Sequence, residues 1–188
     1  MTVRYLIDNV LPLDVYLEIE KLVTGETIDW VLHKGTCGNQ ISSGDWRFTH
    51  TLYHQRFNHT QKHLQSFMPI FNIAPQIETM ICSKLNCDIY TKEPEQRPWH
   101  TDQHCNCEYS YTQILYFNDC NGKTIFKDDG YTVESKRNRA IVFSSGLEHS
   151  GITQTDSPRR YVLNTNFFAD PKTIPTGKIV SVSPHINA

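Results

Sequence analysis

Short apolar segments separated by turn-forming pairs fill the second half of this chain. Turns are expected at Glu93-Pro94, Asn121-Gly122, Asp129-Gly130 and Ser157-Pro158. The segments between them predict strands at 85–90, 99–103, 110–117, 123–126, 131–134, 139–143 and 160–168. Regularly spaced short strands are typical of a sandwich or a barrel. This pattern therefore predicts a β-core over residues 85–170.

The first 84 residues have a different character. Apolar residues at helical spacing run from Val15 to Val23, and Asp14 just before them is a candidate helix cap. Residues 60–83 also carry a helical pattern, which Pro69 and Pro75 interrupt. Residues 30–60 are polar, contain glycines and are expected to include long loops. We predict one domain, mainly β with N-terminal helices (α+β). It would consist of helical and loop support (1–84), the β-core (85–170) and a peripheral tail (171–188).

Size and charge exclude several classes of protein. A chain of 188 residues is long enough for one packed domain. Its 18 Lys and Arg residues against 20 Asp and Glu residues give no electrostatic case for nucleic-acid binding. There is no apolar run of about 18 residues that would span a membrane. The N-terminus lacks a signal-peptide pattern, so a cytoplasmic location is expected.

Two histidines and one aspartate carry the pattern of an open metal site. On a strand, residues i and i+2 face the same side, so His100 and Asp102 would project together. His149 lies in a turn-rich segment after the apolar strand 139–143 and could approach the same ion. Two imidazoles and one carboxylate suit Fe(II) with positions left open. The alternative is three polar residues that never meet.

The strand 160–168 carries a candidate anion-binding residue. Arg160 would point inward with Val162 and Asn164, while Tyr161, Leu163 and Phe167 would pack outward against the helices. A guanidinium group matches a carboxylate bidentately. Two alternatives stay open. Arg159 is the rival by position, and Arg160 could form an ordinary ion pair with Glu148 or Asp156.

Taken in order, the motifs resemble the Fe(II)/2-oxoglutarate-dependent dioxygenase superfamily, and within it the prolyl 4-hydroxylase-like branch. The matching stretch runs from about Leu85 to Phe168 and contains Trp99-His100-Thr101-Asp102, Ile114–Asp119, Asn121–Phe126, Asn138–Phe143, His149-Ser150-Gly151 and Arg160–Leu163. The resemblance implies a double-stranded β-helix (jelly-roll, cupin-like) core. It assigns His100, Asp102 and His149 to iron and Arg160 to the distal carboxylate of 2-oxoglutarate, with Tyr90 and Tyr116 as further co-substrate ligands.

The resemblance also implies the reaction and its cofactors. These are Fe(II), 2-oxoglutarate and O2, with ascorbate as a candidate reductant, for hydroxylation of a small molecule or a protein side chain with release of succinate and CO2. The chain's small size and helical N-terminal half resemble oxygenases of marine phages, which would act in the host cytoplasm. The alternatives are a peptidyl-prolyl 4-hydroxylase, a cupin oxygenase without co-substrate, and a non-catalytic β-barrel that binds metal or a small acid.

Three positions depart from the prolyl hydroxylase pattern. Asn121-Gly122 stands where the family has Gly-Gly, which is expected to change only a turn. Arg97 and Asn166 stand at positions that are aromatic and face the substrate in prolyl hydroxylases. We therefore expect both residues to contact a polar or anionic substrate.

Some residues outside these motifs stay open in function. His50, His54, His59 and His63 are candidates for a second metal site or for solvated side chains. Residues 46–50 are a candidate substrate-covering loop or a packed connection. Arg139 is as compatible with a structural role as with substrate binding. Cys105 and Cys107 lie close to the candidate iron site; structural thiols are expected, with zinc or redox chemistry as the alternative.

Overall fold

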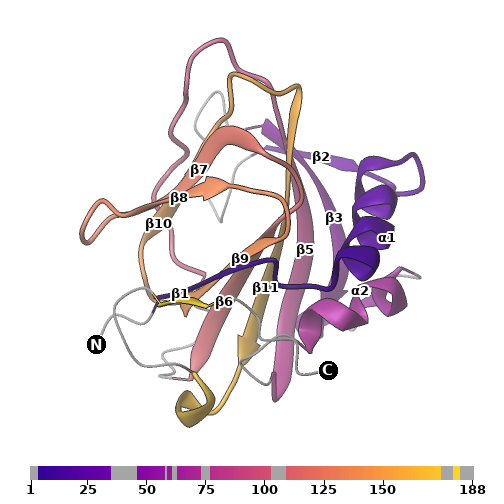
Figure 1. The fold of residues 1–188 in the computed structure, drawn as a ribbon, viewed down its shortest axis with the longest axis vertical. Helices are drawn as coiled ribbons and strands as arrows, with labels where there is room; N and C mark the ends of the chain where they lie inside the picture. Colours follow the sequence, from indigo (N-terminus) through magenta and orange to yellow (C-terminus); the bar gives the residue numbers. More distant parts are fainter. Residues whose placement is uncertain are drawn as a thin grey trace.

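Two sheets, one large and one small, face each other and form the body of the protein (Figure 1). The computed structural model describes residues 4–34, 46–57, 59–60, 63–72, 77–102, 109–174 and 180–182. The large sheet runs in the order β12 (Val180–Val182), β1 (Arg4–Asp8), β9 (Arg139–Ser144), β6 (Ser110–Tyr116), β11 (Arg159–Phe168), β5 (Thr79–Ile89), β3 (Trp46–His54) and β2 (Val31–Lys34), with β4 (His59–Thr60) paired to β3. The small sheet is β10 (His149–Ile152), β7 (Cys120–Phe126) and β8 (Thr132–Ser135). This arrangement confirms the predicted mainly-β, jelly-roll fold.

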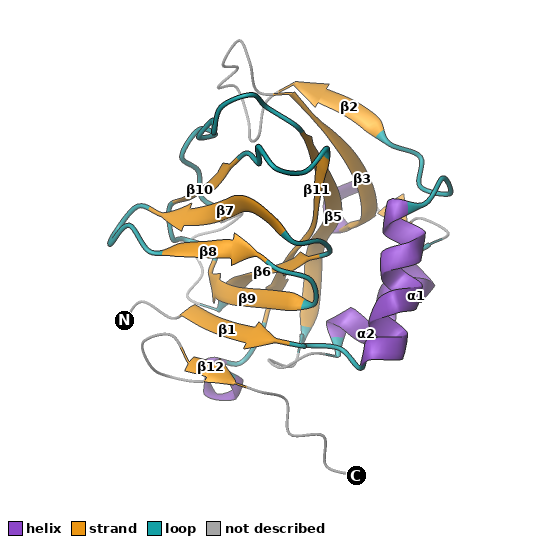
Figure 2. Cartoon of the chain, turned by 45° about the horizontal axis from the view of Figure 1, so that its top comes forward, coloured by secondary structure: helices purple, strands orange, loops and turns teal. Residues whose placement is uncertain are grey.

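Helices α1 (Leu13–Thr24) and α2 (Leu64–Phe71) lie on the outer face of the large sheet (Figure 2). Their apolar sides join one core with the outward-facing strand residues. The core members include Tyr16, Ile19 and Val23 from α1, Phe67, Ile70 and Phe71 from α2, and Leu52, Leu85, Leu115, Tyr161, Leu163 and Phe167 from the strands. The described residues also contain two short 3-10 helices, Gln55–Phe57 and Pro171–Thr173. None of the helices in these described segments is long and apolar enough to cross a membrane.

A second, smaller core fills the space between the two sheets. It consists of Ile114, Tyr116, Phe126, Val133, Ile141, Phe143 and Val162. Strand β11 contributes alternate side chains to the two cores. Tyr161 and Leu163 belong to the core on the helix side, and Val162 belongs to the core between the sheets. The predicted alternation on this strand is therefore confirmed. Its inner face, which starts at Arg160, carries the polar residues described below.

Several expected element boundaries were wrong. Residues 30–60, expected to include long loops, contain strands β2 and β3, although 35–45 lie outside the described residues. The helical stretch expected over 60–83 ends at Phe71. From Thr79 onward the chain already belongs to β5, because pairing with β11 outweighs the local helical pattern.

Three further details differ from expectation. Asp14 does not cap α1: Pro12 occupies the cap position and no side-chain capping bond forms. Residues 99–102 form no continuous strand, only an isolated bridge between His100 and His149. His149 in turn begins strand β10 instead of lying in a turn. The tail does form an edge strand, since β12 pairs in parallel with β1.

Candidate metal centre

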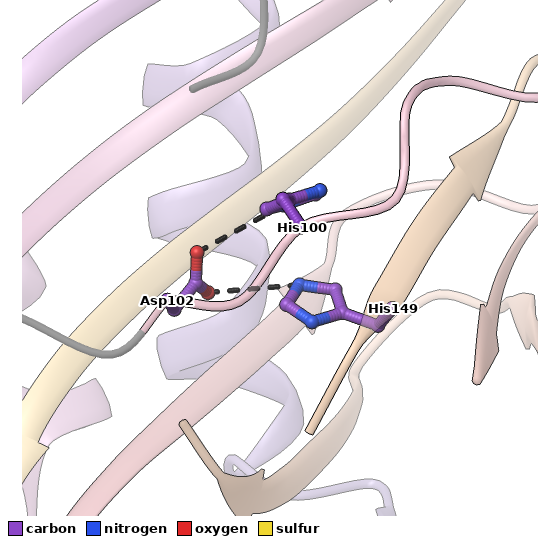
Figure 3. Close-up of side chains that lie close together, drawn as sticks. All are labelled: His100, Asp102 and His149. Atoms are coloured by element: carbon purple, nitrogen blue, oxygen red, sulfur yellow. Dashed lines mark ion pairs between the residues drawn. The ribbon is translucent and has the colours of Figure 1, made fainter. Parts of the chain in front are cut away.

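Three potential metal ligands, His100, Asp102 and His149, come together between the sheets (Figure 3). One ligand atom of each lies within 4.8 Å of the others. The Nε2 atom of His149 is 3.6 Å from Asp102 Oδ2, and that of His100 is 3.9 Å from Asp102 Oδ1. Within the described residues this is the only such cluster of three or more ligand side chains. The predicted triad is therefore assembled, and three residues that never meet are excluded.

Backbone pairing brings the two histidines together. The His149 N–H donates to His100 O at 2.9 Å, and the His100 N–H donates to His149 O at 3.1 Å. The segment that carries His100 is thereby fixed to the edge of the small sheet. Asp102 is held on the same segment, since its N–H donates to Ser145 O at 3.0 Å. The spacing His-x-Asp thus works through a bridge and not through a regular strand.

Both imidazole rings are oriented by backbone carbonyl groups. His100 Nδ1 lies 3.1 Å from Pro98 O, and His149 Nδ1 lies 3.0 Å from Leu147 O. A carbonyl oxygen can only accept, so each Nδ1 carries the proton and donates. In the neutral ring this leaves the Nε2 lone pair directed at the centre of the triad, which is the arrangement that a metal-ligating histidine requires.

The charge states of the site also suit a cation. Burial, together with the neighbouring His149, lowers the pKa of His100 and favours its neutral, ligating form. Burial on its own would raise the pKa of Asp102, but His149, His100 and a hydrogen bond from Asn164 outweigh it and hold that pKa below its ordinary value. The donor set of two imidazole nitrogens and one carboxylate fits Fe(II) with open coordination positions.

Asp102 is held by side chains from the large sheet. Asn164 Nδ2 on β11 donates to its Oδ2 at 2.9 Å. The Thr112 hydroxyl on β6 lies 3.2 Å from the same oxygen. A carboxylate ligand fixed by such hydrogen bonds keeps its second oxygen aimed at the ion. Sequence reasoning did not single out either residue as a site residue, although the alternation on β11 placed Asn164 on the inner face.

Arg160 lines a pocket together with two of the three triad residues, His100 and His149. The pocket is lined by Arg47, Asn86, Asp88, His100, Ile114, Thr124, His149, Gly151, Arg160, Val162 and Asn164. Arg160 is buried, and its Nη1 and Nη2 atoms donate to Asp88 Oδ2 at 3.3 Å and to Thr124 Oγ1 at 3.4 Å. Its ion-pair partner is therefore Asp88, not Glu148 or Asp156. The rival Arg159 is exposed and donates to the Tyr161 hydroxyl at 3.1 Å.

Gly122 makes room for the Arg160 side chain. A Cβ atom at position 122 would lie 2.7 Å from Arg160 Cδ, closer than carbon atoms can pack, and would make a tight contact of 3.2 Å with Gln154 Cβ. Gly122 is therefore more than the turn residue expected from the sequence. It lies within β7 and lets the arginine cross the strand backbone.

The two tyrosines differ in their placement. Tyr116 is fully buried, its hydroxyl donates to Thr124 Oγ1 at 2.8 Å, and its ring lies 5.4 Å from the Arg160 guanidinium carbon. Burial raises the pKa of Tyr116, so the phenol is neutral. Tyr90 is 51% exposed, follows the end of β5 and does not line the pocket. The structure thus brings Tyr116, but not Tyr90, next to Arg160.

The two expected substrate residues are both buried. Arg97 packs beside the pocket: its Nη2 lies 3.8 Å from Asp88 Oδ1, and its Cγ would lie 3.9 Å from a Cβ at Gly151. Asn166 lies behind the triad, where its Oδ1 is 3.1 Å from the Thr112 hydroxyl. Neither residue is among those that line the pocket, and Arg97 lies next to two that do, Asp88 and Gly151.

The remaining candidates have structural positions. Residues 46–50 belong to strand β3, so they are not a covering loop. Arg139 forms an ion pair with Asp8 at 2.5 Å. The His50 and His63 rings lie 6.0 Å apart, and no second metal cluster is found in the part of the chain that the structure describes. The side chain of His59 and residues Cys105 and Cys107 lie outside it.

Asn86 and Asp88 are pocket residues that no sequence pattern had singled out. Asn86 and Asp88 lie on the inner face of β5 and line the pocket. Leu85 and Cys87, which alternate with them along the strand, belong to the core on the helix side. The segment 85–90 was predicted as a strand, so its alternation was the signal that could have found both polar residues. Arg47 also lines the pocket, but from strand β3 and not from the covering loop or packed connection expected over residues 46–50.

The fold resembles solved oxygenases. An oxidoreductase of the 2OG-Fe(II) oxygenase family from Burkholderia pseudomallei matches with a TM-score of 0.64 at 11% identity over 85% of this chain and 82% of that chain. A prolyl hydroxylase from Trichoplax adhaerens, in complex with a hypoxia inducible factor peptide fragment, matches with a TM-score of 0.56 at 15% identity over 90% and 84%. The epimerase SnoN from nogalamycin biosynthesis, in complex with Fe3+, alpha ketoglutarate and nogalamycin RO, gives 0.59 at 12% identity over 89% and 79%.

The match is one of structure. No protein-family model and no curated protein matches the sequence. At these identities the likeness establishes the fold, which is the jelly-roll fold of the 2OG-Fe(II) oxygenase superfamily, as the sequence resemblance implied.

Proposed function

We propose that this chain is an Fe(II)- and 2-oxoglutarate-dependent dioxygenase that hydroxylates a substrate and releases succinate and CO2. The observation that carries the proposal is the buried Arg160 in a pocket that is also lined by His100 and His149, two members of the His100–Asp102–His149 cluster. A metal-binding module has no need of a guanidinium beside its ion. A cupin oxygenase without co-substrate has no need of it either.

The proposal assigns a role to each of the main residues of the site. His100, Asp102 and His149 would hold Fe(II), which supplies the oxidant made from O2 and 2-oxoglutarate when both are bound. Arg160 would bind the distal carboxylate of 2-oxoglutarate through its guanidinium fork, with Thr124 beside it and Tyr116 packed behind Thr124. Ile114 and Val162 line the pocket and would exclude water from the reacting groups.

The overall reaction balances without a further oxidant. One O2 and one 2-oxoglutarate oxidise a C–H bond of the substrate to C–OH. One oxygen atom enters the alcohol and the other enters succinate, and CO2 leaves from the former keto acid. Ascorbate would keep the iron in its ferrous form between turnovers.

The direct test is conversion of 2-oxoglutarate to succinate. Purified protein with Fe(II), ascorbate and 2-oxoglutarate should form succinate slowly even without the primary substrate. His100→Ala and His149→Ala should abolish the conversion. Arg160→Ala should weaken 2-oxoglutarate binding by about 2–5 kcal/mol, which appears as a large rise in its KM.

Arg159→Ala is the matched control, because this neighbouring arginine is exposed on the same strand. It should leave the KM for 2-oxoglutarate unchanged. If Arg159→Ala raised the KM and Arg160→Ala did not, the assignment of the co-substrate residue would be wrong. Succinate formation that persists in both histidine variants would remove the basis for the iron site.

The primary substrate is proposed to be polar or anionic. Arg97 stands at a position that is aromatic in the prolyl hydroxylases that this chain resembles, and it lies beside the pocket. A mass-spectrometric screen of metabolites and peptides tests this, since the product gains one oxygen atom in step with succinate. Efficient hydroxylation of proline-rich peptides that Arg97→Ala leaves unaffected would return the chain to the peptidyl-prolyl 4-hydroxylase alternative.

A further inference from the structure

Three arginines meet one buried carboxylate on the wall of the pocket. Asp88 and Arg160 are direct cross-strand neighbours in the pairing of β5 with β11. Arg47 lies beside them on β3, since the next pair along, Phe48 and Cys87, is in register. Strands β3, β5 and β11 are consecutive in the large sheet, so the order Arg47, Asp88, Arg160 forms a row across it. Arg97 reaches the same carboxylate from the segment before His100.

The two oxygens of Asp88 face different arginines. Oδ2 accepts from Arg160 Nη1 at 3.3 Å. Oδ1 lies 3.8 Å from Arg47 Nη2 and 3.8 Å from Arg97 Nη2. These last two contacts are longer than a hydrogen bond and are therefore Coulombic attractions across a gap. Asp88 thus holds Arg160 on one side and gathers Arg47 and Arg97 on the other.

Arg47 belongs to the pocket that holds the candidate metal ligands. It lines that pocket together with His100, Asp88 and Gly151. Arg97 is fixed next to it: its N–H donates to Gly151 O at 2.8 Å, and its Nη2 donates to Trp46 O at 3.4 Å. Two guanidinium groups therefore lie within 3.8 Å of the same Asp88 oxygen, and one of them, that of Arg47, belongs to a residue that lines the pocket.

Guanidinium pairs in a partly dry pocket favour an oxyanion. Each fork can donate two parallel hydrogen bonds to a carboxylate, phosphate or sulfate group. The low dielectric of a buried site strengthens that attraction. The distal carboxylate of 2-oxoglutarate has two oxygens, which Arg160 and Thr124 are placed to satisfy, so a second anionic group is the fitting occupant of the Arg47–Arg97 side.

We propose that Arg47 and Arg97, gathered by Asp88, form an oxyanion subsite that binds a negatively charged group of the primary substrate. This inference rests on the proposed function and names the substrate class: a molecule with a carboxylate, phosphate or sulfate beside the C–H bond that reacts. The subsite sets specificity, and Asp88 is its positioning residue.

The test measures anion binding to the loaded protein by calorimetry. The protein carries redox-inert Mn(II) and saturating 2-oxoglutarate, and the probes are acetate and sulfate, both weak ligands of that ion. One probe anion should bind per chain. Arg47→Gln should weaken its binding by about tenfold or more, as loss of a charge-assisted pair implies. Stronger binding of acetate than of sulfate points to a carboxylate-bearing substrate, and the reverse points to a phosphate or sulfate ester.

Two further variants are measured beside Arg47→Gln, one in the proposed subsite and one as a control. Arg97→Lys retains the charge but loses the planar fork, and it should weaken the probe severalfold. Arg159→Gln, which removes an exposed arginine, should change nothing. Because Arg47 is less buried than Arg97, at 13% against 5% side-chain exposure, Arg47→Gln decides the matter if Arg97→Lys fails to fold.

The inference is overturned if Arg47→Gln binds acetate and sulfate as the parent does. It is also overturned if the probes bind only when 2-oxoglutarate is absent, since the arginines would then serve the co-substrate. Failure of the proposed function looks different: 2-oxoglutarate itself would not bind to the Mn(II)-loaded protein. The probe titration on that protein would still report on Arg47 and Arg97.

Discussion

At the scale of single residues, the candidate metal centre depends on groups that would not touch a bound ion. Backbone carbonyls fix the Nδ1 protons of His100 and His149, and Asn164 holds Asp102. The side chains are therefore preorganised, with the rings and the carboxylate already facing one point. Substitutions of these supporting groups should change metal affinity without altering the ligand set.

Asn164→Ala should lower the affinity for Fe(II) or Mn(II) by about 10- to 100-fold, because Asp102 loses the donor that orients it. Competition with a chelator of known affinity measures this. Thr165→Ala is a matched control on the same strand, since its hydroxyl points to the other side and lies 3.0 Å from the Ser83 hydroxyl. Equal metal affinity in the two variants would show that Asn164 has no part in holding the ligand.

Gly122→Ala should disturb Arg160. The new Cβ would lie 2.7 Å from Arg160 Cδ, so the side chain has to move. We expect 2-oxoglutarate binding to weaken by about tenfold while metal binding is kept, because a displaced guanidinium loses its bidentate alignment. Gly151→Ala is the comparison, since a Cβ there meets its nearest neighbours at 3.9 Å. Unchanged 2-oxoglutarate affinity in Gly122→Ala contradicts the packing argument.

At the scale of secondary-structure elements, the helices support the sheet that carries the site. Tyr16 on α1 is buried, and its hydroxyl donates to Phe117 O at 2.6 Å, just after β6. Burial raises the pKa of Tyr16, which keeps the hydroxyl protonated and able to donate. This bond ties the helix layer to a strand that contributes Thr112 and Ile114 to the site.

Tyr16→Phe should therefore cost about 1–2 kcal/mol of stability, the cost of leaving a buried carbonyl without its donor. Urea unfolding measures the change. Tyr109→Phe serves as control, because Tyr109 is 51% exposed and should lose little. A Tyr16→Phe variant as stable as the parent would mean that water replaces the hydroxyl without cost.

Local sequence patterns predicted strands β6, β9 and β11, but they did not predict strand β3, which also contributes to the site. Alternation located β6, β9 and β11 to within a residue or two and placed Arg160 on the inner face. It failed for β3, where a polar strand with one inward and one outward face resembles a loop in sequence. Arg47 was therefore expected in a covering loop or packed connection and lies on that strand instead. It failed also at residues 79–83, whose helical spacing is overridden by pairing with β11.

The other features that the sequence did not predict depend on contacts between residues that are far apart in the chain. Nothing local to Asp88 shows that three arginines, from β3, from β11 and from the segment before His100, converge on it. Tyr90 was assigned through the family resemblance, but β5 ends at Ile89 and leaves its ring exposed. The cluster of three candidate metal ligands could be predicted because His-x-Asp is a local spacing, and the family resemblance pointed to His149 as the third member.

At the scale of the whole molecule, the buried charges should make stability depend on pH. Burial on its own would raise the pKa of Asp88, but Arg47, Arg160 and Arg97 outweigh it and hold the pKa below its ordinary value of 3.8. The folded state therefore binds the proton less tightly than the unfolded state. The stability that Asp88 contributes is present above about pH 4 and is lost as the pH falls through the folded-state pKa.

Asp88→Asn should consequently destabilise the metal-free protein by about 3 kcal/mol at neutral pH, because three guanidinium groups lose their shared anion. The difference from the parent should shrink below about pH 4. Chemical unfolding at a series of pH values measures it, with Asp14→Asn, an exposed carboxylate, as control. A difference that stays constant from neutral to acid pH would mean that Asp88 is not ionised in the folded protein.

The central claim is that one site holds iron through His100, Asp102 and His149 and holds 2-oxoglutarate through Arg160. Anaerobic titration with Fe(II) followed by 2-oxoglutarate tests it most directly, through the visible charge-transfer absorption that an iron-bound keto acid gives. We predict one Fe(II) per chain and an absorption band that requires both components. His149→Ala should lose the iron, and Arg160→Ala should keep the iron but need far more 2-oxoglutarate. Full iron binding in the histidine variants, or a band that Arg160→Ala leaves unchanged, would contradict the account.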